Sequence, residues 1–153
     1  MNALRLPGSA REASFSLLSR LLLLSPLFFL GQDAMALDIF MHINGTAHRV
    51  VLEENDAARD FAARLPLTLT FEDYAATERI SYLERKLTLG ASPRSTTPKK
   101  GDFTYYSPWG NIAVFMKPFR HSEGLVPLGR MDEAALEALR GSGDLPVEFR
   151  LAE

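Results

Sequence analysis

The chain contains no cysteine, one tryptophan and three histidines among its 153 residues. The absence of cysteine excludes disulfide bonds, thiol catalysis and a lipid-modified N-terminal cysteine. The histidines show neither an HxH nor an HExxH spacing, so we expect no metal ion, and no motif indicates another cofactor. The formal net charge is −2 and there is no basic stripe, so we expect no nucleic-acid partner.

Long apolar runs are also absent, except for one near the N-terminus, Leu17–Leu30. The part that follows Arg20 is shorter than the roughly 20 residues that cross a bilayer. Arginines precede the run, and Ala34 and Ala36 follow it. This order is typical of a secretory signal with a basic start, an apolar core and an A-x-A cleavage site.

We therefore expect residues 1–36 to be a signal peptide and residues 37–153 to form the mature domain in the periplasm or outside the cell. No stable membrane span would remain after cleavage. The alternative is that residues 1–36 are a mis-assigned N-terminal extension, that translation starts at Met35 and that the protein is cytoplasmic.

The part from Leu37 onward has the length of one domain with a single core. Residues 1–36 hold three of the 17 basic and two of the 19 acidic residues, which leaves 14 and 17 and a net charge of −3. The sequence leaves the oligomeric state open.

Apolar and polar residues alternate in several short segments, which is typical of half-buried strands. Asn44-Gly45 separates the first two and is a strong hairpin signal. Pro127 interrupts a later segment and predicts an edge strand or a bulge. The segments expected to be strands are 37–43, 47–52, 67–71, 102–106, 112–115, 125–130 and 146–151.

Two short amphipathic segments predict helices near 57–65 and 132–140. Residues 74–89 mix charged and apolar side chains without a clear period, which predicts either one or two short strands or irregular structure. Residues 90–100 carry two prolines and predict a loop, which serves either as a partner contact or as a floppy rim. About seven short strands without a repeated strand–helix unit predict a mainly β protein, a single small β-barrel with two short helices.

The stretch Gly101–Phe115 combines two adjacent tyrosines, a Ser-Pro-Trp-Gly turn and a buried strand, Ile-Ala-Val-Phe. It follows a Leu-Pro-Leu-Thr-Leu segment that ends the first helix and precedes Leu128-Gly129-Arg130 before the second. In this order and spacing, residues 37–151 resemble the small prokaryotic cyclophilin-like domain family. The resemblance implies a cyclophilin-like barrel in a family largely without an assigned activity.

The family is similar in fold to peptidyl-prolyl isomerases, so the resemblance implies prolyl isomerisation as the alternative, enzymatic function. Those enzymes use an arginine on the strand after the first helix. Here that strand, Leu67–Phe71, has no arginine, and Arg49 lies before the helix. We therefore expect no useful isomerase activity.

A binding function is the favoured interpretation: an exported domain that holds a peptide or small ligand in an aromatic groove. Aromatic side chains with one polar atom suit such a groove. Tyr105 and Tyr106 are adjacent, so they point to opposite faces of a strand and at most one belongs to the core. The alternative is that the aromatic residues simply fill the barrel. The candidate ligand-binding residues are Tyr105, Tyr106, Trp109, Phe119 and Arg130.

Two other constellations are better explained structurally. In a two-residue hairpin Ile43 pairs with Thr46, so His42 and His48 lie on opposite faces and cannot share a metal ion. Ser107 lacks the glycine-framed elbow of a hydrolase nucleophile and is typical of a turn.

Overall fold

The computed structural model describes residues 36–143 and 146–152, all within one compact unit, Gln32–Glu153. The expected signal segment, apart from Ala36, lies outside the described residues. The strands are β1 (Asp38–Ile43), β2 (Thr46–Leu52), β3 (Leu67–Thr70), β4 (Glu72–Tyr74), β5 (Glu78–Tyr82), β6 (Ser95–Thr96), β7 (Asp102–Tyr106), β8 (Asn111–Phe115), β9 (Ser122–Glu123), β10 (Leu125–Met131) and β11 (Pro146–Leu151); the helices are α1 (Asp56–Ala62) and α2 (Glu133–Arg140).

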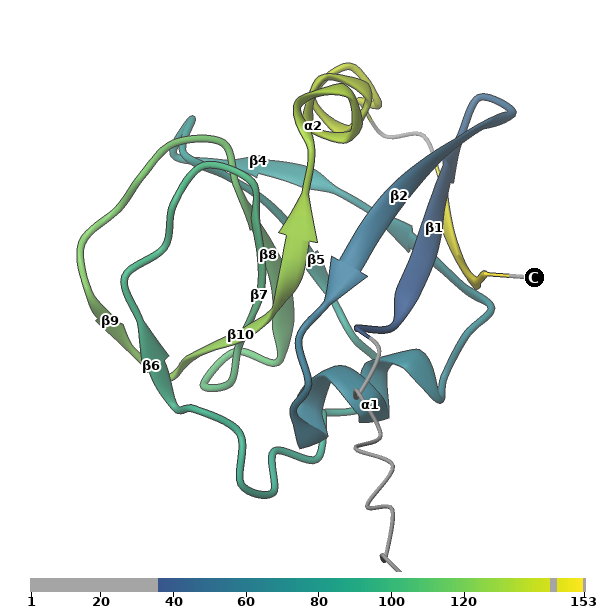
Figure 1. Cartoon of the computed structure of the whole chain (residues 1–153). Helices are drawn as coiled ribbons and strands as arrows, with labels where there is room; N and C mark the ends of the chain where they lie inside the picture. Colours follow the sequence, from purple (N-terminus) through teal and green to yellow (C-terminus); the bar gives the residue numbers. More distant parts are fainter. Residues whose placement is uncertain (1–35, 144–145, 153) are drawn as a thin grey trace, which may run out of the picture. The chain divides into compact units, whose positions relative to one another are not determined.

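Nine of these strands form one antiparallel sheet in the order β3-β11-β1-β2-β10-β7-β8-β5-β4. The strands at the two ends of this order, β3 and β4, are separated in the chain only by Phe71. The sheet therefore curls until its two edges meet in one stretch of chain, and it forms a nearly closed barrel (Figure 1). The expected β-barrel with two helices is confirmed.

The first hairpin follows directly from its turn. Asn44 and Gly45 have φ values of 50° and 77°, a region that asparagine and glycine tolerate best. The register pairs Met41 with His48 and His42 with Ala47. The two histidines therefore lie on opposite faces of the hairpin, as predicted.

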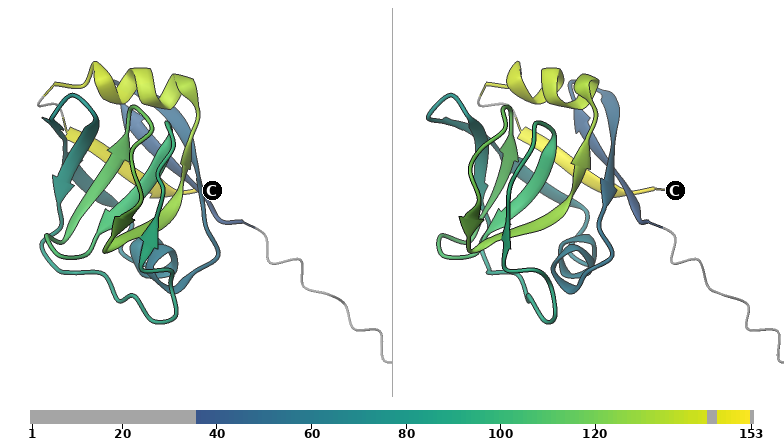
Figure 2. Two further views of the ribbon diagram at one scale, coloured as in Figure 1. Left: turned by 90° about the vertical axis from the view of Figure 1, so that its left-hand side faces the viewer. Right: turned by 60° about the vertical axis from the view of Figure 1, so that its left-hand side comes forward.

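The two helices cover opposite ends of the barrel, α2 at the top and α1 at the bottom of the views in Figures 1 and 2. The side chain of Asn55 caps α1 by accepting a hydrogen bond from the Ala58 N–H (3.0 Å). Asp132 caps α2 in the same way. The second helix has the predicted bounds, whereas the first ends at Ala62 rather than at residue 65.

The barrel core is built around four phenylalanines. Phe149 of β11 lies 5.7 Å from Phe61 of α1, 5.8 Å from Phe103 of β7 and 6.2 Å from Phe71, measured between ring centroids. All four rings are 0% exposed. This cluster joins α1 to strands on both sides of the barrel.

β10 lies between β2 and β7, so it is not an edge strand, but the register does shift between Pro127 and Gly129. The bulge alternative is therefore confirmed. A Cβ at Gly129 would come 2.3 Å from the carbonyl oxygen of Val51 on β2. Only glycine allows the two strands to approach this closely.

The seven expected strands are all present in the described part of the chain, with four more. β5 lies in the segment 74–89, so the short-strand alternative holds there, and β4 ends at the first residue of that segment. β6 lies in the segment expected to be a loop and pairs with β9, so residues 90–100 are partly a strand. The Gly124 N–H also donates to the Arg94 carbonyl (2.7 Å), which holds the two segments together outside the main sheet.

Candidate functional site

Strand alternation gives the sheet a second apolar face, outside the barrel. On β7 and β8 the side chains of Phe103, Tyr105, Ile112 and Val114 join the barrel core. Their neighbours belong to a separate buried cluster on the outer face, formed by Ile80, Ala113, Phe115 and Leu125, with Tyr106 packed against it. The segment Phe119–Glu123 lines the rim of this face, and the space between is a groove of about 430 Å³.

We call this space the aromatic groove; its aromatic lining is Tyr74, Tyr106, Trp109, Phe115 and Phe119. Trp109 lies in the turn between β7 and β8, where Gly110 has a φ of 74°. Its ring contacts those of Tyr106 and Tyr74 edge to face, at centroid distances of 5.4 Å and 5.7 Å. Trp109 is nevertheless 49% exposed and Tyr74 is 42% exposed.

The other end of the groove is also aromatic. Phe119 stacks on Phe115 with a centroid distance of 6.3 Å, and the Arg120 guanidinium lies 4.9 Å above the Phe119 ring. His121 is held on the rim: its Nδ1 is 3.1 Å from Thr97 Oγ1, and its Nε2 is 3.4 Å from a Glu123 carboxylate oxygen.

Two polar side chains of the lining lack the partners expected of buried groups. Glu78 is half-buried, and burial raises the pKa of its carboxyl group. Asn111 is 2% exposed; its Nδ2 donates to the Ile112 carbonyl (3.2 Å), but its Oδ1 has no hydrogen-bond partner among the described residues.

Three of the five candidate residues meet in this groove: Tyr106, Trp109 and Phe119. Tyr105 points into the barrel, is 1% exposed and accepts a hydrogen bond from the Leu87 N–H (3.1 Å). The two adjacent tyrosines therefore face opposite sides of the sheet, as predicted, and one of them is core.

Arg130 lies elsewhere, where it forms an ion pair with Asp102 (2.7 Å). Arg49 pairs with Asp38 (2.9 Å). Both arginines line a different surface pocket, beside Met131, and neither lines the aromatic groove.

Sequence reasoning missed Tyr74, Glu78 and Phe115 as groove residues. Phe115 ends the strand predicted to be buried, and an entirely apolar strand does not indicate which of its residues face the groove. Tyr74 and Glu78 belong to β4 and β5, whose segment shows no period. The spacing of Tyr74 and Glu78 matches a tight hairpin in which the two residues pair, but the sequence alone does not indicate that this hairpin forms.

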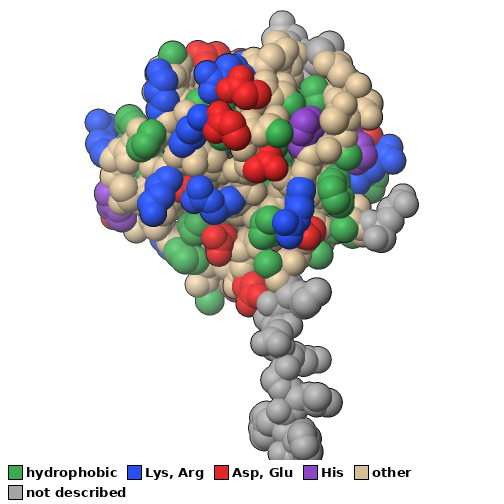
Figure 3. Space-filling view, turned by 45° about the horizontal axis from the view of Figure 1, so that its top comes forward, with side chains coloured by type: hydrophobic (Ala, Val, Ile, Leu, Met, Phe, Trp, Pro, Cys, Tyr) green, Lys and Arg blue, Asp and Glu red, His purple; other side chains and the backbone are tan. Residues whose placement is uncertain are grey.

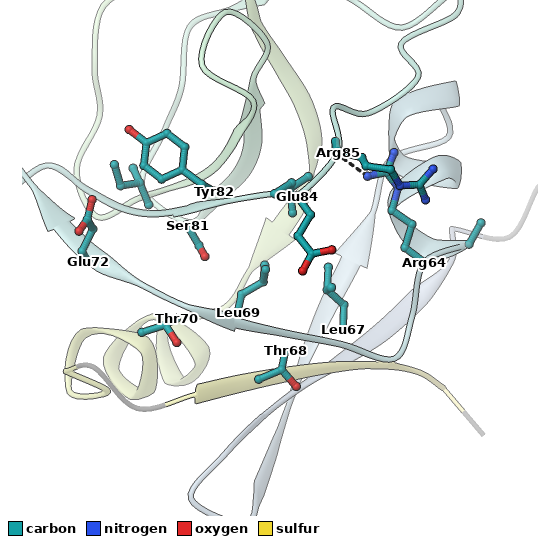
Figure 4. A pocket seen from close by; sticks show the side chains of 13 residues that line it. Arg64, Leu67, Thr68, Leu69, Thr70, Glu72, Ser81, Tyr82, Glu84 and Arg85 are labelled. Carbon is teal, nitrogen blue, oxygen red and sulfur yellow. Dashed lines mark hydrogen bonds between the residues drawn. The ribbon is translucent and has the colours of Figure 1, made fainter.

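A second pocket, of about 670 Å³, lies in the seam where β3 and β5 diverge (Figure 4). In this view Leu67, Leu69 and Glu84 point into the gap, and Arg64 and Arg85 lie at one end. Arg64 is committed there: it pairs with Asp60 (2.7 Å) and donates to the carbonyls of Arg85 (2.7 Å) and Lys86 (2.8 Å).

The seam is open because β3 and β5 diverge and do not pair through backbone hydrogen bonds. The Leu83 N–H donates to Gly110 next to β8, so alternation directs the backbone groups of Tyr82 toward the seam. The Ala152 N–H donates to the carbonyl of Asp38 in β1, so by the same alternation the backbone groups of Thr68 and Thr70 point toward the seam. Tyr82 is the one aromatic residue in the lining of the seam, whereas five tyrosine, tryptophan and phenylalanine rings line the aromatic groove. The groove is therefore the stronger candidate site.

On the face shown in Figure 3, basic and acidic side chains are interspersed and leave no broad area of one sign. Within the described residues, no three histidine or acidic side chains are placed to hold a metal ion.

Comparison with known proteins decides the family. The sequence profile of the cyclophilin-like family matches residues 41–150, which is most of the chain. The chain belongs to the cyclophilin-like family. The resemblance inferred from the order of motifs is thereby confirmed.

One solved structure similar to this cyclophilin-like domain is the solution structure of a hypothetical protein from Archaeoglobus fulgidus. It is 18% identical, covers 80% of this chain and 100% of its own, and superposes with a TM-score of 0.57. At this identity the likeness shows the fold alone. No curated protein matches this cyclophilin-like chain.

Proposed function

We propose that this cyclophilin-like domain is a binding module that holds a small ligand or a short peptide in the aromatic groove. The observation that carries the proposal is Trp109, half-exposed between Tyr74 and Tyr106 above an apolar floor. Ligand sites are typically concave and lined by aromatic side chains with a few polar groups.

The barrel does not need these rings for its own core. The four core phenylalanines and Tyr105 pack with many buried aliphatic residues in the interior, and the outer cluster has its own buried residues. Half-exposed rings gathered over an apolar floor leave apolar area in water, and its burial contributes about 25 cal/mol per Å². A ligand that covers the groove would gain this contribution.

Trp109 also provides the test, because it is the only tryptophan in the chain. We expect a ligand, screened from short peptides, flavins and small metabolites, to change the fluorescence of Trp109 and to raise the melting temperature of the purified protein. With Trp109→Ala or Tyr106→Ala, about ten times more ligand should be needed for the same rise in melting temperature, because aromatic side chains contribute most of the binding energy at such sites.

The matched control is Tyr82→Ala. Tyr82 is 55% exposed but lines the seam rather than the groove, so its replacement should leave binding unchanged. If the groove variants bind normally while folded, or if Tyr82→Ala weakens binding equally, the aromatic groove is not the site.

We also propose that the protein is exported. The support is the arrangement of Arg5 and Arg11, the apolar run Leu21–Leu30 and the Ala34–Ala36 cleavage pattern. No helix in the described part of the chain is long and apolar enough to cross a bilayer.

N-terminal sequencing of the protein from its native host tests the export. The expected result is a chain that begins at Leu37 in the periplasmic or external fraction, because signal peptidase cuts after the second small residue. A chain that begins at Met35 or Ala36 in the cytoplasmic fraction would contradict export.

A further inference from the structure

Tyr74, Glu78 and Phe115 lie side by side on three neighbouring strands and all line the aromatic groove. Glu78 is the one acidic residue of the three. On β4 and β8 its direct cross-strand partners are Tyr74 and Phe115. Residues directly opposite each other in antiparallel strands lie on the same face, with Cβ atoms about 5 Å apart. The carboxylate of Glu78 therefore emerges between two aromatic side chains.

The environment does not compensate the charge of this carboxylate. Glu78 is half-buried, and among the described residues no hydrogen bond or ion pair holds its side chain. Burial alone raises the pKa of Glu78, and no neighbouring cation acts against that effect. Two other polar side chains of the lining contact other groups: the Arg120 guanidinium lies over the Phe119 ring, and His121 lies beside Glu123.

The rings around Glu78 favour a positive charge as well. The face of an aromatic ring is electronegative and attracts ammonium and guanidinium groups within about 6 Å of its centroid. The groove already shows this interaction, with Arg120 at 4.9 Å from Phe119. Trp109, the strongest cation-binding ring type, lines the groove and is 49% exposed, so part of its ring surface is open to a ligand.

We propose that the ligand of the aromatic groove is an organic cation, with an ammonium group of the kind at the end of a lysine side chain placed against Glu78. This inference rests on the proposed binding function and names its ligand class. A bound ammonium would compensate the half-buried carboxylate and would contact Tyr74 and Trp109 through their ring faces. A purely apolar ligand would leave the carboxylate of Glu78 uncompensated and further desolvated.

Three matched probes test the proposal by titration followed through Trp109 fluorescence: the N-acetyl methylamides of lysine, norleucine and glutamate. Lysine and norleucine have side chains of similar length, and only lysine carries the ammonium. We expect the lysine probe to bind about tenfold more tightly than the norleucine probe, as is typical when a hydrogen bond to a charged group is added. The glutamate probe should bind most weakly.

Glu78→Gln keeps the shape of the side chain and removes its charge. It should abolish the preference for lysine over norleucine. The matched control is Glu123→Gln, which removes the other acidic side chain of the lining, 84% exposed on the rim, and should keep the preference. Glu78→Gln should also fold. Because burial raises the pKa of Glu78, the folded protein loses stability as the pH rises through that pKa and the carboxyl group becomes charged, whereas glutamine stays neutral.

The outcomes separate the two proposals. If norleucine or glutamate binds as tightly as lysine and changes Trp109 fluorescence, the cation inference is wrong and the binding groove stands. The inference is also wrong if Glu78→Gln keeps the preference or if Glu123→Gln abolishes it. If a ligand from the wider screen binds at Trp109 while the lysine probe does not, only the cation inference fails; if nothing binds there, both proposals fail.

Discussion

Phe149→Ala is expected to lower the free energy of unfolding by about 4 kcal/mol, the usual range for removing a fully buried aromatic ring. Phe149 is 0% exposed and contacts the rings of Phe61, Phe71 and Phe103. It lies on β11, which pairs with both β1 and β3. The cavity would therefore open where α1 and these strands meet.

Urea unfolding followed by circular dichroism measures this loss. Phe119→Ala is the matched control, because it makes the same chemical change at a ring that is 37% exposed; its expected cost is about 1 kcal/mol. Equal losses for the two variants would show that Phe149 does not join the helix to the barrel.

Arg79→Ala is expected to lower the free energy of unfolding by about 3 kcal/mol, because it leaves buried acceptors without a donor. Arg79 is 8% exposed, and its Nη2 donates to the Phe71 carbonyl (3.1 Å), to Ser142 Oγ (3.2 Å) and to the Gly143 carbonyl (3.0 Å). This single guanidinium connects β5 to the bend between β3 and β4 and to the segment after α2.

The matched control for this change is Arg140→Ala. Arg140 is exposed, and among the described residues it pairs with Glu137 (3.3 Å), so its replacement should cost about 0.5 kcal/mol or less. Thermal unfolding of both variants measures the difference. A stability of Arg79→Ala equal to that of Arg140→Ala would rule out the buried connection.

Much of the fold was predictable because its signals are local. Asn44-Gly45 predicts its hairpin and register since the turn itself needs positive φ. Asp132 and Gly141 bound the second helix because they serve its first and last free backbone groups. The opposite orientation of Tyr105 and Tyr106 follows from the period of a strand.

Other parts were not predictable from neighbouring residues. The strands β4 and β5 lie between exposed charges, so their apolar residues show no period, and β6 and β9 have only two residues each. Such strands exist because a distant segment pairs with them, as Thr96 pairs with Ser122. The first helix ends at Ala62 rather than at residue 65 because the chain turns there to enter β3, whose position is set by its pairing with the distant strand β11.

By itself, the sequence determined the mainly β class, the first hairpin, the bounds of the second helix and the family, because turns, caps and side-chain alternation depend on residues close together in the chain. Only the tertiary structure decided which aromatic residues form a site. Tyr74 and Trp109 meet because β4 pairs with β5, and β5 with β8. The same pairing places Glu78 between Tyr74 and Phe115, because the lateral order of strands in a sheet is set by long-range packing and leaves no local trace in the sequence.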